Sequence, residues 1–255
     1  MSQIEVLDRD IVSGLEKGLA VIEAFDEVRP KLSLGEVAKL TGLTRAAARR
    51  YLLTLVKNRY AEYDGKFFWL SPRVLKLGYA YLSSTSLSGR LQPYLEDISR
   101  KTGESSSAAI LDGVDIVYIA RSSTSRIMAV DLNVGSHLPA YCSALGRALL
   151  AYSDDGVVSS YIESASLVPL TPKTRHTVPE LREILLEVKR NGFALVDEEL
   201  ALGLRSIAVP IFNADGKVVT AINISVATVR ASVEEILDRF LPILLATQED
   251  LRRVL

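Results

Sequence analysis

The chain has 255 residues, of which 48% are hydrophobic, and its 30 lysines and arginines almost balance its 31 aspartates and glutamates. This composition supplies a sizeable core, excludes intrinsic disorder and excludes a uniformly basic coat of the histone kind. One cysteine and two histidines rule out an intrachain disulfide and a Cys-rich or His-rich zinc centre, so we expect no metal and no cofactor. The polar start and the lack of an apolar run of about 20 residues predict a soluble, cytoplasmic protein without a membrane segment.

Basic residues are concentrated towards the amino terminus. Residues 1–82 carry 13 basic and 10 acidic side chains, whereas residues 83–255 carry 17 and 21. Within residues 31–76 there are ten basic side chains and three acidic ones, a net charge of +7. Such a local excess is typical of a small nucleic-acid-binding module, and a solvated lysine-rich face is the competing interpretation.

Three helices and a hairpin are predicted in the first 70 residues. Apolar residues at helical spacing mark the helices, and Asp64-Gly65 is a strong hairpin signal. In chain order, the elements are a helix over 13–27, a short helix after Ser33, a helix over 45–59, and strands over 60–63 and 66–70.

Capping residues predict where these helices begin and end. Ser13 is the expected N-cap of the first helix, and Ser33 with Glu36 forms a capping box before the second. Gly42 supplies the positive φ of the turn that follows, and Thr44 caps the third helix.

The second and third helices have the pattern of a DNA-binding helix-turn-helix, and the hairpin after them is its wing. On the third helix Ala48 and Leu52 share one side, while small residues and arginines share the other, as a helix entering the major groove requires. An ordinary helical hairpin with a charged outer face is the alternative. The candidate DNA contacts are Ser33, Thr44, Arg45, Ala46, Arg49, Arg50, Lys57 and Lys66.

A domain boundary is predicted in the Ser/Gly-rich stretch 83–89, after a helix over 73–82, which gives domains 1–82 and 83–255. Strands grouped at both ends of the second domain predict an α+β fold, with one antiparallel sheet flanked by helices. The expected helices cover residues 90–102, 143–152, 155–164, 178–191 and 231–254, and the expected strands cover 105–111, 115–121, 127–134, 193–197, 205–212 and 217–227.

The second domain carries no catalytic signature. The sequence lacks G-x-G-x-x-G, G-x-S-x-G and G-x-x-x-x-G-K-[ST]. His137 and Cys142 are conceivable as a thiol–imidazole pair, but no third residue is predicted to orient them. For the consecutive carboxylates Asp197, Glu198 and Glu199 we expect mostly a solvated strand end. An enzyme with an appended helical domain is therefore only the alternative interpretation.

A small-molecule pocket explains the polar residues of this domain better. Ser143 is a candidate N-cap, so the N–H groups at the start of its helix can receive a carboxylate. Asn223 and Ser225 lie two apart on one strand and face the same side, and Ser206 is on the neighbouring strand. We therefore expect hydrogen bonds from Ser206, Asn223 and Ser225 to a small organic acid in an apolar cup.

Five segments of the chain resemble the IclR family of transcriptional regulators, over essentially its whole length. They are 15-LEKGLAVIEAF-25, 43-LTRAAARRYLLTL-55, 72-PRVLKLGYAYLSS-84, 138-LPAYCSALGRALLA-151 and 197-DEELALGLRSIAVPI-211. The second, third and fourth are similar to the branch that regulates protocatechuate and β-ketoadipate degradation and 4-hydroxybenzoate use. The resemblance implies a winged helix-turn-helix followed by a GAF-like effector domain, in a dimer or a tetramer. With the pattern above, it makes the candidate effector contacts Ser143, Ala144, Leu145, Gly146, Asp197, Leu204, Ser206, Asn223 and Ser225.

The whole sequence predicts a DNA-binding transcriptional regulator of aromatic-acid catabolism that responds to a small organic acid. A homodimer is expected on a pseudo-palindromic double-stranded operator, because one recognition helix covers only a half-site, and the family resemblance implies a dimer or a tetramer. A DNA-binding protein that needs no effector is a further alternative. Arg121, Arg126 and Arg205 are the cations nearest to the predicted pocket in sequence, and structural salt bridges are their expected role.

Overall fold

The computed structural model describes residues 7, 10–84, 87–124 and 132–255. The chain divides into two compact units, Met1–Tyr81 and Leu82–Leu255. Arg126 and most of the strand expected at 127–134 lie outside the described residues. None of the helices that are described is long and apolar enough to cross a membrane.

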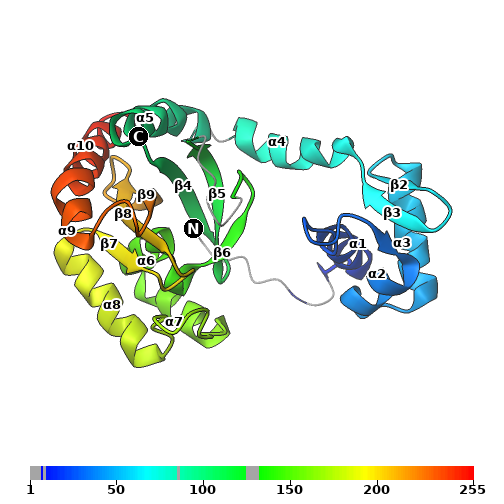
Figure 1. The fold of residues 1–255 in the computed structure, drawn as a ribbon. Helices are drawn as coiled ribbons and strands as arrows, with labels where there is room; N and C mark the ends of the chain where they lie inside the picture. The colour runs from blue at the N-terminus through cyan, green and yellow to red at the C-terminus, as the bar shows by residue number, and fades with distance from the viewer. Residues whose placement is uncertain (1–6, 8–9, 85–86, 125–131) are drawn as a thin grey trace. The chain divides into compact units, whose positions relative to one another are not determined.

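The first unit combines helices with a small antiparallel sheet (blue to cyan in Figure 1), in which β3 pairs with both β1 and β2. The two-residue strand β1 was not predicted, because its pairing partners, Phe68 for Leu32 and Phe67 for Ser33, lie far along the chain. The elements are α1 (Ser13–Glu23), β1 (Leu32–Ser33), α2 (Leu34–Thr41), α3 (Arg45–Lys57), β2 (Ala61–Tyr63), β3 (Phe67–Leu70), the 3-10 turn η2 (Pro72–Val74) and α4 (Leu75–Ser84), which contains the point of division between the units.

Caps hold the second and third helices as predicted. The Ser33 side chain accepts a hydrogen bond from the Glu36 N–H at 3.4 Å, and the Glu36 carboxylate accepts one from the Ser33 N–H at 2.7 Å. Gly42 has a φ of 67°, and the Thr44 hydroxyl accepts from the Ala47 N–H at 3.2 Å. The predicted capping box, turn and cap are confirmed.

The first helix differs from its prediction at both ends. Val12 occupies the N-cap position and Ser13 is already helical, so the predicted Ser13 cap is wrong. The helix ends at Glu23 rather than at residue 27. The Asp26 carboxylate accepts from the Arg29 N–H at 2.7 Å and pairs with its guanidinium, which closes a turn where the helix was expected to continue.

The core of the first unit sets the orientation of α3. Ala48 and Leu52 are fully buried, so the arginines on the other side of the helix face solvent. The core comes from all three of the first helices and from the sheet: Val21, Leu32, Val37, Ala38, Ala48, Leu52 and Phe68.

In the described part of the second unit, six strands form one antiparallel sheet in the order β6-β5-β4-β9-β8-β7. The predicted α+β architecture is confirmed. In this register Ser107 lies opposite Asn223, and Ser225 lies opposite Ser206. The strands are β4 (Ser105–Asp112), β5 (Asp115–Ser122), β6 (His137–Pro139), β7 (Ala194–Asp197), β8 (Leu204–Phe212) and β9 (Val218–Ala227).

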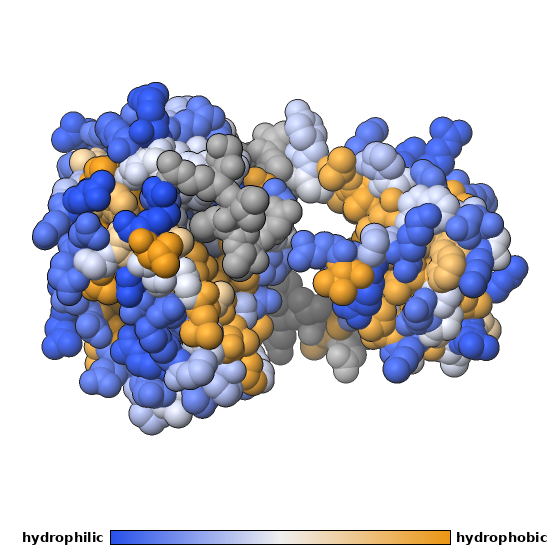
Figure 2. Space-filling model, viewed as in Figure 1, coloured by the Kyte–Doolittle hydropathy of each residue, from blue (hydrophilic) through white to orange (hydrophobic). Residues whose placement is uncertain are grey.

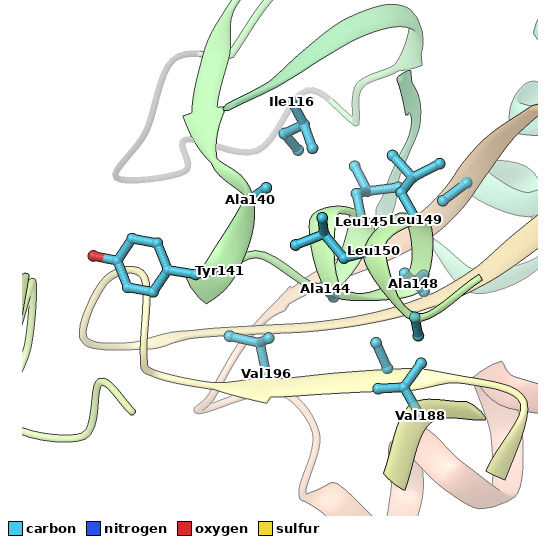
Figure 3. Packing of buried hydrophobic residues seen from close by; sticks show 14 of the residues in the cluster. Ile116, Ala140, Tyr141, Ala144, Leu145, Ala148, Leu149, Leu150, Val188 and Val196 are labelled. Atoms are coloured by element: carbon cyan, nitrogen blue, oxygen red, sulfur yellow. The ribbon is translucent and has the colours of Figure 1, made fainter. Parts of the chain in front are cut away.

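Helices cover both faces of this sheet (Figure 1): α5 and α10 pack on one face, and α6 packs on the other with α8 against it. Figure 3 shows Leu145, Leu149 and Leu150 of α6 among Ile116 and Val196 of the sheet. The described helices are α5 (Leu87–Thr102), the 3-10 turn η3 (Ala140–Cys142), α6 (Ala144–Ala151), α7 (Asp155–Ser164), α8 (Val178–Asn191), α9 (Val233–Glu235), the π turn η4 (Ile236–Phe240) and α10 (Leu241–Arg252).

The closing helix expected over 231–254 runs without a break from Val233 to Arg252 but contains a π turn. This turn lies between α9 and α10, and Pro242 lies in the first turn of α10. Proline has no N–H to donate to the preceding turn, so the α-helical hydrogen-bond ladder is interrupted there.

Candidate functional site

The predicted DNA contacts lie on exposed surface of the first unit. Arg49, Arg50 and Lys57 are exposed along α3. Thr44, Arg45 and Ala46 are exposed at its start, whereas half-buried Ser33 serves as the cap of α2. The structure therefore brings six of the eight candidates to one exposed helix start and helix face: Thr44, Arg45, Ala46, Arg49, Arg50 and Lys57.

The Arg45 guanidinium lies beside the first turn of α2. A Cβ atom added at Gly35 would lie 3.2 Å from the Arg45 Nη2 atom, a distance tighter than ordinary van der Waals contact. Because Arg45 is exposed and its side chain is flexible, a small movement of the guanidinium would relieve this contact.

The wing is a tight hairpin that presents two cations. The Asp64 carboxylate accepts from the Lys66 and Phe67 N–H groups at 3.0 and 2.8 Å, and these two hydrogen bonds hold the pKa of Asp64 below its usual range. The Lys66 ammonium lies 4.9 Å from the centre of the Phe67 ring. The Lys31 ammonium, from the segment before β1, lies 4.2 Å from the centre of the Trp69 ring. The sequence placed Lys31 in the basic segment but not among the DNA contacts, because the pairing of β1 with β3 was not foreseen.

The second unit contains a cavity of about 320 Å³ between the start of α6 and the strands β7 to β9. Seven of the nine candidate effector contacts line it: Ser143, Ala144, Leu145, Leu204, Ser206, Asn223 and Ser225. Among the described residues of its lining, none is Lys, Arg, Asp or Glu. Sequence reasoning missed further lining residues that come from distant parts of the chain: Tyr118, Leu132, Leu138, Cys142, Val196, Leu200, Ala201, Leu202, Gly203, Ala227, Thr228 and Val229.

The first turn of α6 forms one side of this cavity. The Ser143 hydroxyl accepts from the Gly146 N–H at 3.0 Å, which confirms the predicted cap. Ala144 and Leu145 both line the cavity, and their N–H groups belong to the first turn, where a helix has no carbonyl of its own to bond. The partial positive charge of this helix end favours an anion.

A polar cluster on β8 and β9 forms another part of the lining. The Asn223 Nδ2 atom donates to the Ser206 hydroxyl at 2.8 Å and to the Ser225 hydroxyl at 3.0 Å. Ser225 donates to Ser206 at 3.3 Å, and Ser206 donates to the Ile224 carbonyl at 3.3 Å. The three side chains are thus brought together as the strand pattern predicted, but their hydrogens are directed to protein atoms.

The structure does not bring Gly146 and Asp197 to the cavity wall. A Cβ atom at Gly146 would lie 2.3 Å from the Ala140 carbonyl oxygen, so this glycine allows α6 to pack against η3. The Asp197 carboxylate accepts from Arg205 Nε at 2.5 Å and lies 3.7 Å from the Lys173 ammonium. Arg205 therefore has the salt bridge that was expected of such arginines.

A buried ion pair between Arg147 and Glu199 lies behind the cavity. Arg147 Nη1 and Nη2 lie 2.7 and 2.6 Å from the two Glu199 carboxylate oxygens, and Arg147 Nε donates to the Tyr141 carbonyl at 2.7 Å. Burial raises the pKa of Glu199, but the hydrogen bonds and charge of Arg147, with the amide and guanidinium of Arg175, bring it below its ordinary 4.5. The pair joins α6 to the loop from Leu200 that lines the cavity.

This pair corrects the expectation of a solvated strand end. Strand β7 stops at Asp197, Glu198 takes a left-handed φ of 59°, and Glu199 is only 5% exposed. The one available signal was Arg147 itself, a lone charge in the otherwise apolar run 144–151. Its partner was not identifiable, because it lies 52 residues away.

Cys142 and His137, which the sequence suggested as a thiol–imidazole pair, lie in different surroundings. Cys142 is buried, and burial raises the pKa of its thiol to about 11, so the thiol stays protonated at neutral pH. The His137 imidazole is half exposed and lies 3.8 Å from the Asp112 carboxylate. Across the described ranges, no group of three or more His, Cys, Asp or Glu side chains is placed to hold a metal ion.

Comparison with known proteins agrees with both halves of this description. Residues 14–65 match the IclR helix-turn-helix domain, and residues 79–253 match the C-terminal domain of the bacterial transcriptional regulator IclR. The Pca regulon regulatory protein of Pseudomonas putida is 47% identical over 245 residues, which cover 96% of this chain and 84% of the relative.

Solved structures show the same similarity. A putative transcriptional regulator of Rhodococcus sp. RHA1 is 46% identical, with a TM-score of 0.82, and the match covers 95% of this chain and 98% of the Rhodococcus chain. A double mutant of the PobR inducer-binding domain from Acinetobacter, in complex with 3-hydroxybenzoic acid, is 31% identical with a TM-score of 0.62, covering 66% of this chain and 98% of its own. This chain is therefore a DNA-binding transcriptional regulator rather than an enzyme, and it belongs to the IclR family.

Proposed function

We propose that this regulator controls genes of aromatic-acid catabolism and that an aromatic acid, bound in the cavity of the second unit, changes its affinity for operator DNA. The cavity carries the proposal: it is largely apolar, and its volume of about 320 Å³ lies at the lower end of the range for ligand pockets, roughly 300–1,000 Å³. The likeness to a Pca regulon regulator and to an inducer-binding domain that holds 3-hydroxybenzoic acid supports this class of effector.

In this proposal the carboxylate of the effector lies at the start of α6. The Ala144 and Leu145 N–H groups and the helix dipole supply the favourable field. Leu138, Val196 and Leu204 offer apolar contacts to a ring. Because a ligand shifts an equilibrium only through different affinities for two states, the effector need not touch the DNA-binding unit.

The first unit is the proposed DNA-binding domain, with residues 1–82 acting on the operator and 83–255 sensing the effector. Helix α3 enters the major groove, where Arg49 and Arg50 reach bases and phosphates, and Lys66 on the wing meets the backbone. A dimer on a pseudo-palindromic operator follows from the half-site geometry, and membership of the family supports a dimer or a tetramer. Exposed apolar side chains on α1, Leu15 and Leu19, are available for a subunit contact, and Figure 2 shows apolar patches between the charged residues of this unit.

Salt-dependent operator binding tests this function. Replacing a phosphate contact by Ala should reduce the slope of log K against log salt by about 0.9, whereas replacing a base contact should cost about 1–3 kcal/mol on the operator. We expect Arg49→Ala and Arg50→Ala to show these effects in gel shifts with and without an aromatic acid.

The matched control is Arg182→Ala, which removes an exposed arginine from α8 of the second unit. It should leave both the operator affinity and the salt slope unchanged. Wild-type operator affinity in the Arg49→Ala/Arg50→Ala double variant would refute the DNA-binding surface. Operator affinity that no aromatic acid alters would refute the effector part of the proposal.

A further inference from the structure

Three consecutive acids at the end of β7 lie next to the cavity of the second unit without being part of its lining. Asp197 is the last residue of the strand, and Glu198 and Glu199 follow it. The next five residues, 200–204, all line the cavity. The acids are therefore placed to act on the cavity through other residues, and their hydrogen bonds show which ones.

Glu199 attaches helix α6 to this part of the cavity wall. Besides its buried pair with Arg147, its carboxylate accepts from the Arg175 N–H at 2.9 Å, and its carbonyl accepts from the Thr174 hydroxyl at 2.6 Å. A buried ion pair adds little to stability compared with apolar residues of similar size, because both charges lose their hydration. A bidentate pair does fix the distance and direction between two elements, here α6 and the loop after β7.

Glu198 closes the loop that follows it. One carboxylate oxygen accepts from the Gly203 N–H at 2.8 Å, and the other pairs with the Lys173 ammonium. The Glu198 N–H donates to the Leu204 carbonyl at 2.9 Å, and its carbonyl accepts from the Thr171 hydroxyl at 2.7 Å. Its φ of 59° is unfavourable for a residue with a side chain, so these hydrogen bonds hold a strained backbone beside the cavity. The hydrogen bonds from Lys173 and Gly203 also hold the pKa of Glu198 below its usual range.

Asp197 acts on a second part of the wall through Arg205. The Arg205 Nε atom donates to Asp197 at 2.5 Å, and Nη1 donates to the Thr228 and Ala231 carbonyls at 3.3 and 2.9 Å. The Thr228 N–H in turn donates to the Gly203 carbonyl at 2.9 Å. The turn after β9 and the loop after β7 are thus held by neighbouring carboxylates and bonded to each other.

These two segments, residues 200–203 and 228–229, are called the outer wall below. Leu202 is 62% exposed and Val229 is 93% exposed, although both line the cavity. Side chains that meet solvent as well as the cavity mark a place where the cavity lies near the molecular surface. Local opening costs least where few buried contacts are lost, so the outer wall is a segment that opens at low cost unless it is attached.

We infer that Asp197, Glu198 and Glu199 are positioning residues that hold the outer wall closed, and that opening of this wall sets the rate at which small molecules reach the cavity. The inference rests on the proposed function only for the identity of the small molecule, an aromatic acid. The three carboxylates hold three different elements: the turn after β9, the loop after β7 and α6. Loss of any one attachment should therefore loosen the same wall.

Cys142 provides a probe of this opening that needs no effector. It is the only cysteine of the chain, it lines the cavity, and it is fully buried. The small thiol reagent methyl methanethiosulfonate can modify it only after the protein opens locally or unfolds. Urea separates the two routes, because modification through local opening depends weakly on urea and modification through unfolding depends on it steeply.

Three variants of the full-length chain each remove one attachment: Asp197→Ala, Glu198→Ala and the double variant Arg147→Met/Glu199→Leu, which leaves no unpaired buried charge. We expect Cys142 to be modified at least about tenfold faster in each than in wild type, with a weak dependence on urea. Glu198→Gln keeps an oxygen for the Gly203 N–H, so it should recover part of the wild-type rate.

The matched control is Asp97→Ala on α5. Asp97 pairs with Lys101 at 2.6 Å, its side chain is 31% exposed against 33% for Asp197, and it is not part of the cavity lining. It should leave the rate of Cys142 modification unchanged. In wild type, a bound aromatic acid should slow the modification, and the probes are benzoate, 3- and 4-hydroxybenzoate and 3,4-dihydroxybenzoate.

The outcomes separate this inference from the proposed function. Modification at the wild-type rate in all three variants, or faster modification only with the steep urea dependence of unfolding, would overturn the inference and leave the proposed function standing. An effect of Asp97→Ala as large as that of Asp197→Ala would also overturn it, since the position of the ion pair would not matter. If the variants behaved as expected but none of the aromatic acids protected Cys142, the inference would stand and the proposed effector class would fail.

Discussion

The arginines beside the two candidate sites of this regulator are held in opposite ways. In the first unit Arg49, Arg50 and Lys66 are exposed on a helix face and a hairpin. In the second unit Arg147 is fully buried and bonded through Nε, Nη1 and Nη2. Phosphate contacts need long side chains that adapt to a backbone, whereas recognition of a small ligand needs polar atoms in fixed positions. The difference predicts that substitutions of these residues change operator affinity in the first unit, and effector binding or stability in the second.

The largest expected effect separates effector binding from operator binding. Ser206→Leu or Ser225→Leu replaces a hydroxyl oxygen of the cavity lining by three carbon atoms, so effector binding should be lost when followed by calorimetry. Gel shifts without effector should show wild-type operator affinity, since the proposed contacts to DNA lie in the other unit. Normal effector binding by both variants would show that the effector does not bind in this cavity. Loss of operator binding would show that the two units are not independent.

The next largest effect concerns stability of the second unit. Glu199→Leu leaves the Arg147 guanidinium buried without its carboxylate and should lower the free energy of unfolding by about 3–5 kcal/mol in urea denaturation. The double variant Arg147→Met/Glu199→Leu removes both charges and should recover most of this loss.

The first unit supplies the control for that measurement. Asp26→Ala breaks the Asp26–Arg29 pair, which is exposed on both sides, and should leave the free energy of unfolding almost unchanged. If Glu199→Leu were no more damaging than Asp26→Ala, burial would not distinguish the two ion pairs.

Two glycines extend the comparison to the backbone. Gly146→Ala drives a Cβ atom against the Ala140 carbonyl and should cost about 1–3 kcal/mol through overpacking. Gly42→Ala meets no atom within 4 Å and should cost about 1 kcal/mol, through its φ of 67° alone. Asparagine tolerates this conformation, so Gly42→Asn should be better than Gly42→Ala by thermal unfolding, while Gly146→Asn should be no better than Gly146→Ala.

The smallest expected effect is a dependence of stability on pH. The folded-state pKa of Glu199 lies below its ordinary 4.5. Ionised Glu199 therefore contributes fully to the free energy of unfolding above pH 4.5, and this contribution is lost as the pH falls through the lowered pKa. Glu199→Gln has no carboxyl to protonate, so its urea midpoint should decline less steeply than that of wild type from about pH 5 downward. Parallel declines would show that Glu199 does not contribute to the acid sensitivity.

Short-range signals made the first unit more predictable than the cavity. The Ser33 cap, the Gly42 turn and the Thr44 cap each depend on groups within one turn of chain. Two local signals of the first helix were misjudged: Val12 rather than Ser13 takes the N-cap position, and a turn closed by Asp26 and Arg29 ends the helix at Glu23. In the second unit, strand alternation placed Asn223 and Ser225 on one side, and Ser143 was identifiable as a cap.

The sequence by itself determined the caps, the strand faces, the winged helix-turn-helix pattern and the family. Only the tertiary structure decided that Arg147 pairs with Glu199, which lies 52 residues later, and that the Asn223 amide donates to both Ser206 and Ser225. The physical reason is range. A cap is complete within three or four residues, whereas a buried ion pair and hydrogen bonds between side chains of neighbouring strands depend on strand register and on how a helix packs on the sheet.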